Sequence, residues 1–466
     1  MKHLLPVFAL TLLPLSAYAA DRPPNVVIVF CDDLGWGDLG CFGNPTIETP
    51  RLDRMAAEGQ KWTQFYVAAP VCTPSRAALM TGRYPIRNGM TSARRVVLFP
   101  NSGGGLPQKE ITLAEMLKQK DYATGCFGKW HLGHLPRFLP TAQGFDTYFG
   151  IPYSNDMDRV GGSPSYHRGA SQDPNYLTKI AYYNVPLMQD EKIVERPADQ
   201  TTITRRYAEK AIDFIEANKD RPFFVYLPHS MPHIPLFASD EFRGKSIRGL
   251  YGDVIEEIDA GVGRIIDALN ELKIADNTLL MFSSDNGPWL TFRTHGGSAG
   301  PLRAGKGTTF EGGQRVPTIF RWPGKIKPGS VVTGLGCTTD MMATLAKLSG
   351  AKMPADRKMD SLDLTPALFG TAASPRTTMA YWTRAELHAY RQGPWKLHVK
   401  QREPINYGRA VVPKEPELYH VEHDISERYN VAEQHPEVVE RLKKAIEAHK
   451  ADVEPFPDQL VIPLKK

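Results

Sequence analysis

The sequence predicts an α/β protein with a large, mostly parallel sheet flanked by helices, followed by a smaller antiparallel sheet with one helix. Three observations predict this fold class. Apolar, β-branched runs such as 25–30 (NVVIVF) are typical of strands buried on both faces. Helix-length segments separate these runs along most of the chain. From about residue 373 the pattern changes to short strand-like runs without long helices between them.

The first part of the chain alternates strand-like and helix-like segments. We expect strands at 25–30, 123–127, 223–227 and 279–282, and helices at 52–58, 113–120, 203–217 and 251–272. This alternation predicts parallel strands, and in such sheets a functional site forms at the carboxyl ends of the strands. The polar, irregular stretch 156–196 is expected to be an insertion at the rim of that site or a long surface loop.

The last part of the chain predicts a small antiparallel sheet closed by a helix. Its expected strands are 379–382, 387–390, 395–399 and 417–420, and its expected helix is 436–451. We therefore expect a signal peptide at 1–20, a large domain with the functional site at 21–372, and a small C-terminal α+β subdomain at 373–466.

The N-terminus has the pattern of a secretory signal. A short basic start precedes an apolar run at 4–15, and Ala17-Tyr18-Ala19 matches a cleavage site. The alternative is a membrane anchor, but the run is short and is broken by Pro6 and Pro14. We expect an exported protein, periplasmic or secreted, with no membrane association after cleavage.

Composition excludes some partners. The chain has 466 residues, 42% of them hydrophobic and 23% charged, which is ordinary for a globular protein. Its net charge of +5 is too small and too dispersed to indicate nucleic-acid binding, so no nucleic acid is expected as a partner.

The stretch 71–83 (VCTPSRAALMTGR) predicts a helix that presents a reactive group. Thr73 suits the N-cap and Pro74 the first helical position, while Gly82 is placed to end the helix. Cys72 would then stand at a helix N-terminus, which favours negative charge, with Arg76 one turn later. The alternative is an ordinary capped helix with a buried free cysteine.

Two oxygen-bearing pairs follow predicted strands. Asp32 and Asp33 come after the first strand, and Asp285 and Asn286 come after the run that ends at 284. Adjacent carboxylates repel each other unless a cation compensates them. Both pairs fall at the carboxyl ends of expected parallel strands, so they can converge on one ion. Oxygen ligands favour Ca²⁺ or Mg²⁺ over zinc. The alternative is a pair of polar turns.

Cationic and proton-transfer candidates lie in three further loops. Lys129 and His131 flank a tryptophan at a spacing of two, so both can face one cavity; the alternative is a surface lysine and a packed histidine. His233 lies between two nearby prolines, and His229 competes with it for the role of acid. Lys306 lies in a Gly-flanked loop, where it is either a site residue or a flexible solvated lysine.

These stretches together resemble the signatures of the type I, formylglycine-dependent sulfatases. The matching segments are CTPSR and LMTGR at 72–83, DDLGWGDLGCFG at 32–43, GKWHLG at 128–133, SSDNGP at 283–288, and GKGTTFEGG at 305–313. RQGPWK at 391–396 and ELY at 417–419 also resemble the small domain of that family. The resemblance spans nearly the whole mature chain and implies the alkaline phosphatase-like sulfatase fold.

The resemblance implies a role for each candidate. Cys72 would be oxidised by a formylglycine-generating or sulfatase-maturating enzyme to Cα-formylglycine, whose hydrated aldehyde is the nucleophile. One divalent ion, usually Ca²⁺ although Mg²⁺ stays open, would be held by Asp32, Asp33, Asp285, Asn286 and the modified Cys72. The remaining implied roles are sulfate binding and charge stabilisation by Arg76, Lys129 and Lys306, a base at His131, an acid at His233, and a weaker site contact at Ser154.

The expected function is an exported sulfatase acting on a sulfated carbohydrate or polysaccharide. Three alternatives stay open: an arylsulfatase for small aryl sulfates, a phosphonate or phosphodiester hydrolase of the same superfamily, and a non-catalytic glycan-binding relative. The disulfide pattern is open too. If Cys72 is converted, Cys31, Cys41, Cys126 and Cys337 remain, and they are either paired or free.

Overall fold

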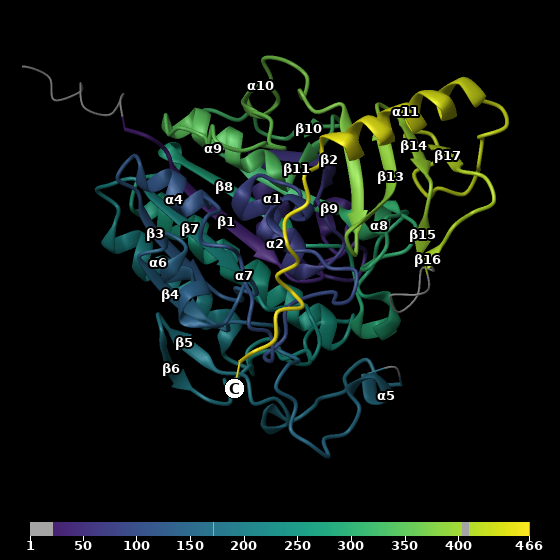
Figure 1. The fold of residues 1–466 in the computed structure, drawn as a ribbon. Coiled ribbons are helices and arrows are strands. Elements are labelled where there is room, and N and C mark those ends of the chain that lie inside the picture. Colours follow the sequence, from purple (N-terminus) through teal and green to yellow (C-terminus); the bar gives the residue numbers. More distant parts are fainter. Residues whose placement is uncertain (1–21, 171, 403–409, 466) are drawn as a thin grey trace, which may run out of the picture.

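A mixed eleven-stranded sheet runs through the middle of the molecule (Figure 1). The structure is a computed structural model that describes residues 22–170, 172–402 and 410–465, so the predicted signal peptide lies outside the described residues. The strands of this sheet are β1 (Asn25–Cys31), β2 (Gln60–Tyr66), β3 (Ala123–Phe127), β4 (Thr147–Gly150), β5 (Leu187–Gln189), β6 (Lys192–Glu195), β7 (Phe223–Pro228), β8 (Thr278–Ser284), β9 (Arg315–Arg321), β10 (Ser330–Val332) and β11 (Gly336–Cys337).

The central strands are parallel, as the sequence predicts. The order across the sheet is β10-β2-β9-β8-β1-β7-β3-β4-β5-β6, and β11 also pairs with β2. Strands β8, β1, β7, β3 and β4 pair in parallel, and four of them are the strands expected from the sequence. Antiparallel pairing begins outside this group, at β9 on one side and at β5 and β6 on the other.

Strand β9 is a central strand that the sequence pattern does not indicate. Pro317 lies within it, and proline cannot donate a ladder hydrogen bond. The strand tolerates this residue because its pairing with β2 shifts register there: Thr318 faces Trp62, whereas Val316 faces Phe65. The proline therefore sits at an irregularity of the ladder rather than in a regular pair.

Helices cover both faces of the sheet. Side chains of β1 alternate between two cores: Val27 and Val29 pack on one face, and Val26 and Ile28 on the other. The first face is covered by α1 (Pro50–Glu58), α6 (Ile203–Ala217) and α7 (Leu250–Glu271). The second is covered by α2 (Cys72–Thr81), α4 (Leu113–Lys118), α9 (Met341–Ser349) and α10 (Thr365–Leu368). The short helices α3 (Pro85–Asn88) and α8 (Glu311–Gln314) lie in connections.

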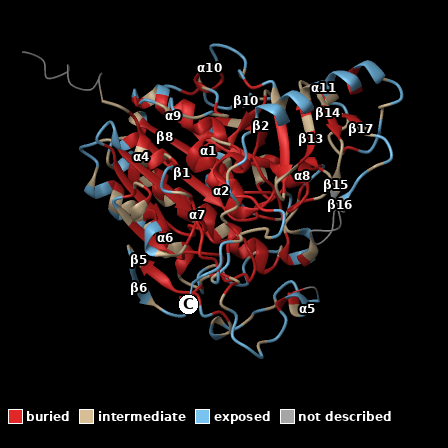
Figure 2. Cartoon of the chain, in the orientation of Figure 1, coloured by how far each residue is buried: buried red, intermediate tan, exposed pale blue. Residues whose placement is uncertain are grey.

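The expected irregular stretch 156–196 is irregular only in part. It contains the short helix α5 (Tyr166–Ala170), and β5 and β6 form a hairpin that extends the large sheet. Figure 2 shows that the central strands of the sheet are buried, whereas β6 and the segment around α5 carry exposed residues. The stretch is therefore partly a continuation of the sheet and partly a loop over its edge.

A separate antiparallel sheet follows, as predicted. Its strands, in spatial order, are β12 (Thr378–Thr383), β13 (Glu386–Gln392), β14 (Trp395–His398) and β17 (Glu417–His420). Helix α11 (Pro436–Asp452) packs on β13 and β14, and β15 (Gln401–Arg402) pairs with β16 (Ala410–Val411). Within the described residues, no helix is long and apolar enough to cross a membrane.

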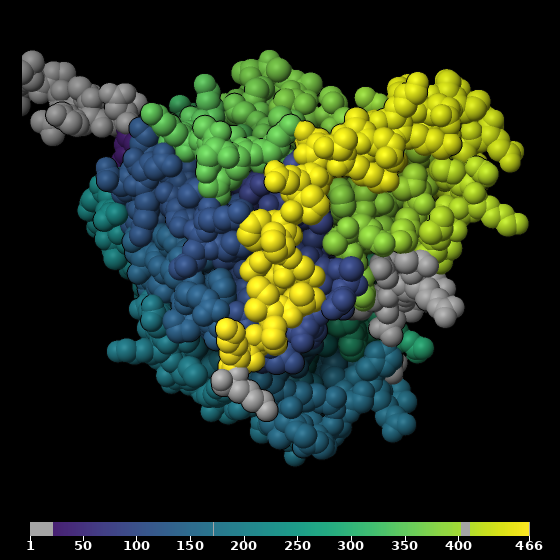
Figure 3. Space-filling model, in the orientation of Figure 1, coloured from purple at the N-terminus to yellow at the C-terminus, as the bar shows by residue number. Residues whose placement is uncertain are grey.

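The C-terminal segment returns to the large domain after α11. In Figure 3 it runs as a strap across the surface formed by residues near 80–110. Backbone hydrogen bonds attach it there: Phe456 donates to Ile86, Gln459 donates to Gly89, and Gly103 donates to Ile462. The strap is thus attached to the stretch 86–103 of the large domain.

Candidate active site

The two oxygen-bearing pairs meet at the carboxyl ends of β1 and β8. These strands are parallel neighbours, with Cys31 opposite Ser284, so the residues that follow them emerge side by side. The Asp33 N–H donates to Asp285 Oδ1 over 3.2 Å. The Asn286 amide donates to Asp33 Oδ1 over 2.7 Å. The convergence expected from the sequence is therefore present in the fold.

Cys72 lies at the start of α2 and points into this group. Its Sγ is 3.4 Å from Asp32 Oδ1 and 3.6 Å from Lys306 Nζ. The placement of Cys72 at a helix N-terminus is as expected, and Gly82 ends the helix in the left-handed conformation, with φ 67°. Burial, reinforced by the charge of Asp32, raises the pKa of the Cys72 thiol.

The predicted N-cap was wrong by two residues. The helix begins at Cys72 itself, with Val71 as N-cap, so Thr73 and Pro74 lie inside the first turn. The Thr73 hydroxyl is occupied elsewhere: it donates to the carbonyl of His131 over 3.0 Å and accepts from the Leu98 N–H over 3.2 Å. Tertiary partners thus replace the local capping bond that the sequence suggests.

Arg76 connects three parts of the site. Its guanidinium contacts Asp285 Oδ2 through Nε at 2.9 Å and through the second terminal nitrogen at 2.8 Å. Its first terminal nitrogen donates to the Lys129 carbonyl over 2.7 Å. Because Arg76 and Asp285 are both fully buried, this fork holds α2, β8 and the loop after β3 in one arrangement.

The two lysines pair with the two aspartates after β1. Lys129 Nζ contacts Asp32 Oδ2 and donates to Ser154 Oγ over 3.1 Å. Lys306 Nζ lies 2.6 Å from Asp33 Oδ1. With Arg76 and Asp285, the site therefore holds three buried cations and three buried carboxylates. Burying this many charged groups costs desolvation free energy, and such groups are typical of functional sites.

The pKa values of the carboxyls diverge. Burial alone would raise the pKa of Asp32, but Lys129, His233 and Arg76 hold it well below its usual range. Burial raises the pKa of Asp33, partly offset by Lys306. Burial and the charge of Asp32 raise the pKa of Asp285 to about 7, opposed by Arg76. Asp32 is thus the carboxylate held most firmly in its charged form.

His233 approaches the same carboxylates from the loop after β7. Its Nε2 is 3.8 Å from Asp33 Oδ2. Its Nδ1 lies 2.5 Å from the carbonyl of Ile234 and 3.5 Å from Ser154 Oγ. A carbonyl only accepts, so Nδ1 carries a hydrogen and Nε2 faces the site. Burial and Lys306 lower the pKa of His233 well below its usual range.

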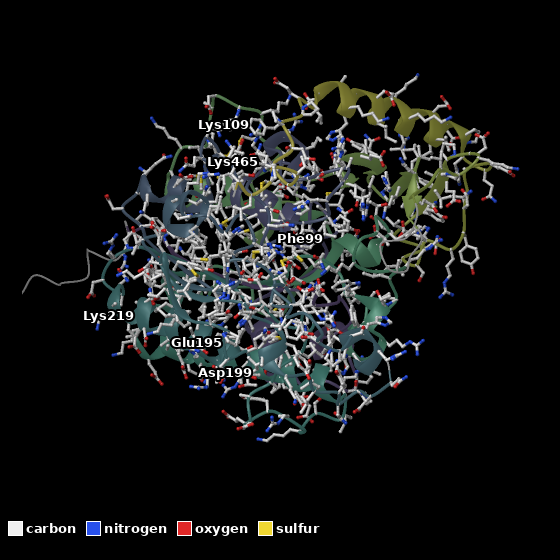
Figure 4. All side chains as sticks on the ribbon, turned by 60° about the horizontal axis from the view of Figure 1, so that its bottom comes forward. Phe99, Lys109, Glu195, Asp199, Lys219 and Lys465 are labelled. Carbon is white, nitrogen blue, oxygen red and sulfur yellow. The ribbon has the colours of Figure 1, made fainter. Side chains whose placement is uncertain are left out.

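The other two histidines have different surroundings. His131 Nε2 donates to the Leu98 carbonyl at 2.9 Å, so Nδ1 is the bare atom of the neutral ring, and Nδ1 has no hydrogen-bond partner among the described residues. Phe99, which follows Leu98, is 38% exposed and is labelled near the middle of the view in Figure 4. His229 packs near Tyr207 in the core, at 6.4 Å between ring centroids, and is not grouped with the aspartates.

The donor set fits a metal ion. Ligand atoms of Asp32, Asp33, Cys72 and His233 lie within 4.8 Å of one another. Asn286 Oδ1 is buried and accepts no hydrogen bond among the described residues, so it has an unused lone pair beside Asp33. Carboxylate and amide oxygens are the ligands that Ca²⁺ and Mg²⁺ prefer. From the sequence, His233 was expected in this site as an acid, and the structure places it among the possible ligand atoms as well.

Trp289 is a site residue that sequence reasoning missed. Its ring centroid is 4.3 Å from Lys306 Nζ and 5.4 Å from the His233 ring centroid. An aromatic residue three positions after Asn286, in the loop that follows a predicted buried strand, was the available signal.

The five cysteines form no disulfide in the structure. The sequence left their pairing open, and in this fold all five are free thiols.

Family models match nearly all of the chain. The model described as "Sulfatase" matches residues 24–351, and the model described as "C-terminal region of aryl-sulfatase" matches residues 374–463. Human arylsulfatase A is 40% identical over 458 residues, covering 93% of this chain and 89% of that protein. Dog (Canis lupus familiaris) N-acetylgalactosamine-6-sulfatase is 38% identical over 485 residues, covering 96% and 89%.

Solved structures are similar over the same extent. One is Ps i-CgsB, whose crystal structure is described as a complex with k-i-k-neocarrahexaose. It is 31% identical to this chain with a TM-score of 0.76, and the match covers 95% of each chain.

Proposed function

Because the chain belongs to the sulfatase family and is thus a hydrolase of sulfuric esters, we propose that it removes sulfate from a carbohydrate or polysaccharide through a nucleophile made from Cys72. The observation that carries the proposal is the position of Cys72. Its side chain lies between a buried carboxylate, Asp32, and a buried ammonium group, Lys306. A nucleophile at this position contacts both a carboxylate that can activate it and a cation that can bind the sulfate group.

The proposal includes one divalent cation. Asp32, Asp33, Asp285 and Asn286 would hold it, together with the modified residue 72, and the unused Asn286 Oδ1 supports this assignment. When bound, such an ion supplies Lewis-acid polarisation and offsets the negative charge of the sulfate. Calcium is the proposed ion, with magnesium as the alternative.

The modification at Cys72 would be made by a formylglycine-generating or sulfatase-maturating enzyme. When present, formylglycine supplies a hydrated aldehyde, which offers two hydroxyl groups in place of one thiol. We propose export to the periplasm or beyond, in keeping with the N-terminal signal pattern at 1–20.

Two lysines of this chain would bind the ester, and Arg76 would support the site beside them. Lys129 and Lys306 are proposed to contact the sulfuryl oxygens, and Arg76 to hold residue 72 and Asp285 in place. Charge spreads over the sulfuryl and leaving oxygens in the transition state. Preorganised cations in a buried site therefore stabilise the transition state more than the ground state. The weaker proposal for Ser154 is a contact that orients Lys129 and His233.

The two site histidines would move protons at defined atoms. His233 is proposed to act as the acid at Nε2, because its Nδ1 is engaged by the Ile234 carbonyl. Nε2 carries a proton only in the cationic ring, which the negative charges of the bound ester and of Asp33, 3.8 Å away, would favour. His131 is proposed to accept a proton at Nδ1, because its Nε2 is engaged by the Leu98 carbonyl. In each ring, one nitrogen therefore fixes the position of the ring and the other exchanges the proton.

Mass spectrometry of the peptide containing residue 72 tests the mechanism. Conversion to formylglycine lowers the mass of that peptide, whereas an unmodified cysteine in fully active native protein would overturn the proposal. Cys72→Ala is expected to abolish turnover. Full activity in Cys72→Ala would also overturn the proposal.

A substrate panel tests the substrate class. It contains sulfated mono- and oligosaccharides, a small aryl sulfate and a phosphodiester. The sugar sulfates are expected to give the highest kcat/KM. Human arylsulfatase A as a relative favours an aryl sulfate as the second candidate. A clear preference for the phosphodiester would reject sulfate ester hydrolysis as the main activity, and no turnover of any ester would support the glycan-binding alternative.

A further inference from the structure

Trp289 is tied to the segment that carries Lys306. It lies five positions after the end of β8 and three after Asn286, and the carbonyl of Pro288, just before it, accepts a hydrogen bond from the Lys306 N–H over 3.0 Å. The Gly287 N–H donates to the Gly313 carbonyl over 3.0 Å. The indole therefore has a fixed place relative to the cations of the site.

The indole contacts the two groups proposed to act on the ester. Lys306 Nζ lies over its ring at 4.3 Å from the centroid. The His233 ring lies 5.4 Å away, tilted by 53°. An alcohol oxygen at His233 Nε2 can therefore have the indole as a neighbour.

A second layer of aromatic residues braces the indole. Phe292, in the 3₁₀ segment η6 (Leu290–His295), packs edge-on against Trp289 at 4.8 Å. Tyr166 of α5 packs against Phe292, and its hydroxyl oxygen accepts from the Leu236 N–H over 3.0 Å and contacts His295 Nδ1 at 2.7 Å. The insertion thus links η6 to the loop of His233.

The indole also lies at the boundary between the buried side chains of the site and solvent. Cys72, His233 and Lys306 are buried, whereas Trp289 is partly exposed and Leu290, next to it, is 38% exposed. A rigid, partly exposed tryptophan that reaches a buried site is a typical anchor for a ligand with an apolar face.

We propose that Trp289 binds the leaving-group side of the substrate, by stacking on the C–H face of the pyranose ring that carries the scissile sulfate. This inference rests on the proposed function. It makes Trp289 a specificity-determining residue for ring alcohols. The competing explanation is that Trp289 acts only through Lys306, by a cation–π contact that would support binding of every sulfate ester alike.

Binding to the Cys72→Ala protein, loaded with calcium, separates these explanations without turnover. Two probes are titrated calorimetrically: a sulfated pyranoside and inorganic sulfate. Adding Trp289→Ala is expected to weaken pyranoside binding about tenfold and sulfate binding less than twofold. Trp289→Phe should recover part of the loss, and Leu290→Ala is the matched control, with less than a twofold effect on either probe.

Equal weakening of both probes by Trp289→Ala would overturn the proposal, as would no weakening of either. Failure of the proposed function gives a different result. In that case wild-type protein would not hydrolyse the pyranoside, although the Cys72→Ala protein binds it in a Trp289-dependent way. If wild-type protein turns over the sugar and Trp289→Ala leaves its KM unchanged, the ring subsite is rejected and the sulfatase activity stands.

Discussion

Lys396 of β14 lies 3.0 Å from Glu311 of α8, and this contact joins the small antiparallel sheet to the large domain. Both side chains are fully buried. Lys396 also contacts Glu427 at 2.9 Å. Burial alone would raise the pKa of Glu311, but Lys396 and Arg391 hold it well below its usual range. Glu311 follows Lys306 by five residues, so the small sheet supports the loop that carries this site lysine.

Replacing Lys396 should therefore destabilise the protein strongly. Lys396→Met leaves Glu311 and Glu427 buried without their shared cation, which typically costs about 3–5 kcal/mol. Urea unfolding is the measurement. Lys443→Met is the matched control, because Lys443 pairs with Glu440 at 2.9 Å on the exposed face of α11, where such a pair contributes about 0–1 kcal/mol. Equal effects from the two variants would contradict this account.

Glu257 of α7 should make the free energy of unfolding depend on pH. Burial raises its pKa to about 7, and its Oε1 has no hydrogen-bond partner among the described residues. Between its unfolded pKa, about 4.3, and this folded value, the native state binds the extra proton. Its contribution to stability is thus present at low pH and is lost as pH rises through this window, by at most about 1.4 kcal/mol per pH unit.

Glu257→Gln should flatten that dependence. The amide mimics the protonated carboxyl, so chemical denaturation between pH 4.5 and pH 7.5 should show a smaller fall in stability than in the wild type. Glu256→Gln is the control, since Glu256 is its partly exposed neighbour on the same helix. An unchanged slope in Glu257→Gln would show that another group is responsible.

Removal of divalent cations should lower both activity and thermal stability. A ligand present at 100 times its Kd adds about 2.7 kcal/mol to the folded state. Chelation should therefore lower the Tm, and added Ca²⁺ should restore it. Asn286→Ala should lose most of this calcium-dependent shift, because it removes the unused amide oxygen beside Asp33. Asn270→Ala, at an exposed position of α7, is the control and should keep the full shift.

His233 and His229 should differ in their effect on turnover. His233→Ala should lower kcat by about 10²–10⁴ for a sugar sulfate, because the alkoxide leaving group needs a proton. The loss should be much smaller for the sulfate of an acidic phenol, which leaves without one. His229→Ala should lower kcat less than tenfold for both substrates, since His229 packs in the core near Tyr207. A substrate-independent loss in His233→Ala would argue against its role as acid.

Much of the architecture follows from patterns local in the sequence. The four central strands and four of the helices were predictable because apolar runs and apolar periodicity report burial directly. In β1 the apolar run is continuous, and its alternate residues reach two different cores. The strand β9 was not, because Pro317 is acceptable there only through a register shift with β2. That shift is a property of the pair of strands.

The candidate site, too, was predictable from the sequence only in part. By itself the sequence placed Asp32, Asp33, Asp285 and Asn286 at one edge of the sheet, because the carboxyl ends of parallel strands share that edge. The tertiary structure decided that β1 and β8 are neighbours, so that the two pairs meet. Only the tertiary structure decided which nitrogen of each histidine is engaged, that Thr73 bonds to His131 rather than capping α2, and that Trp289 covers Lys306. These outcomes depend on side chains from distant segments competing for the same partners, and such competition leaves no periodic signal in the chain.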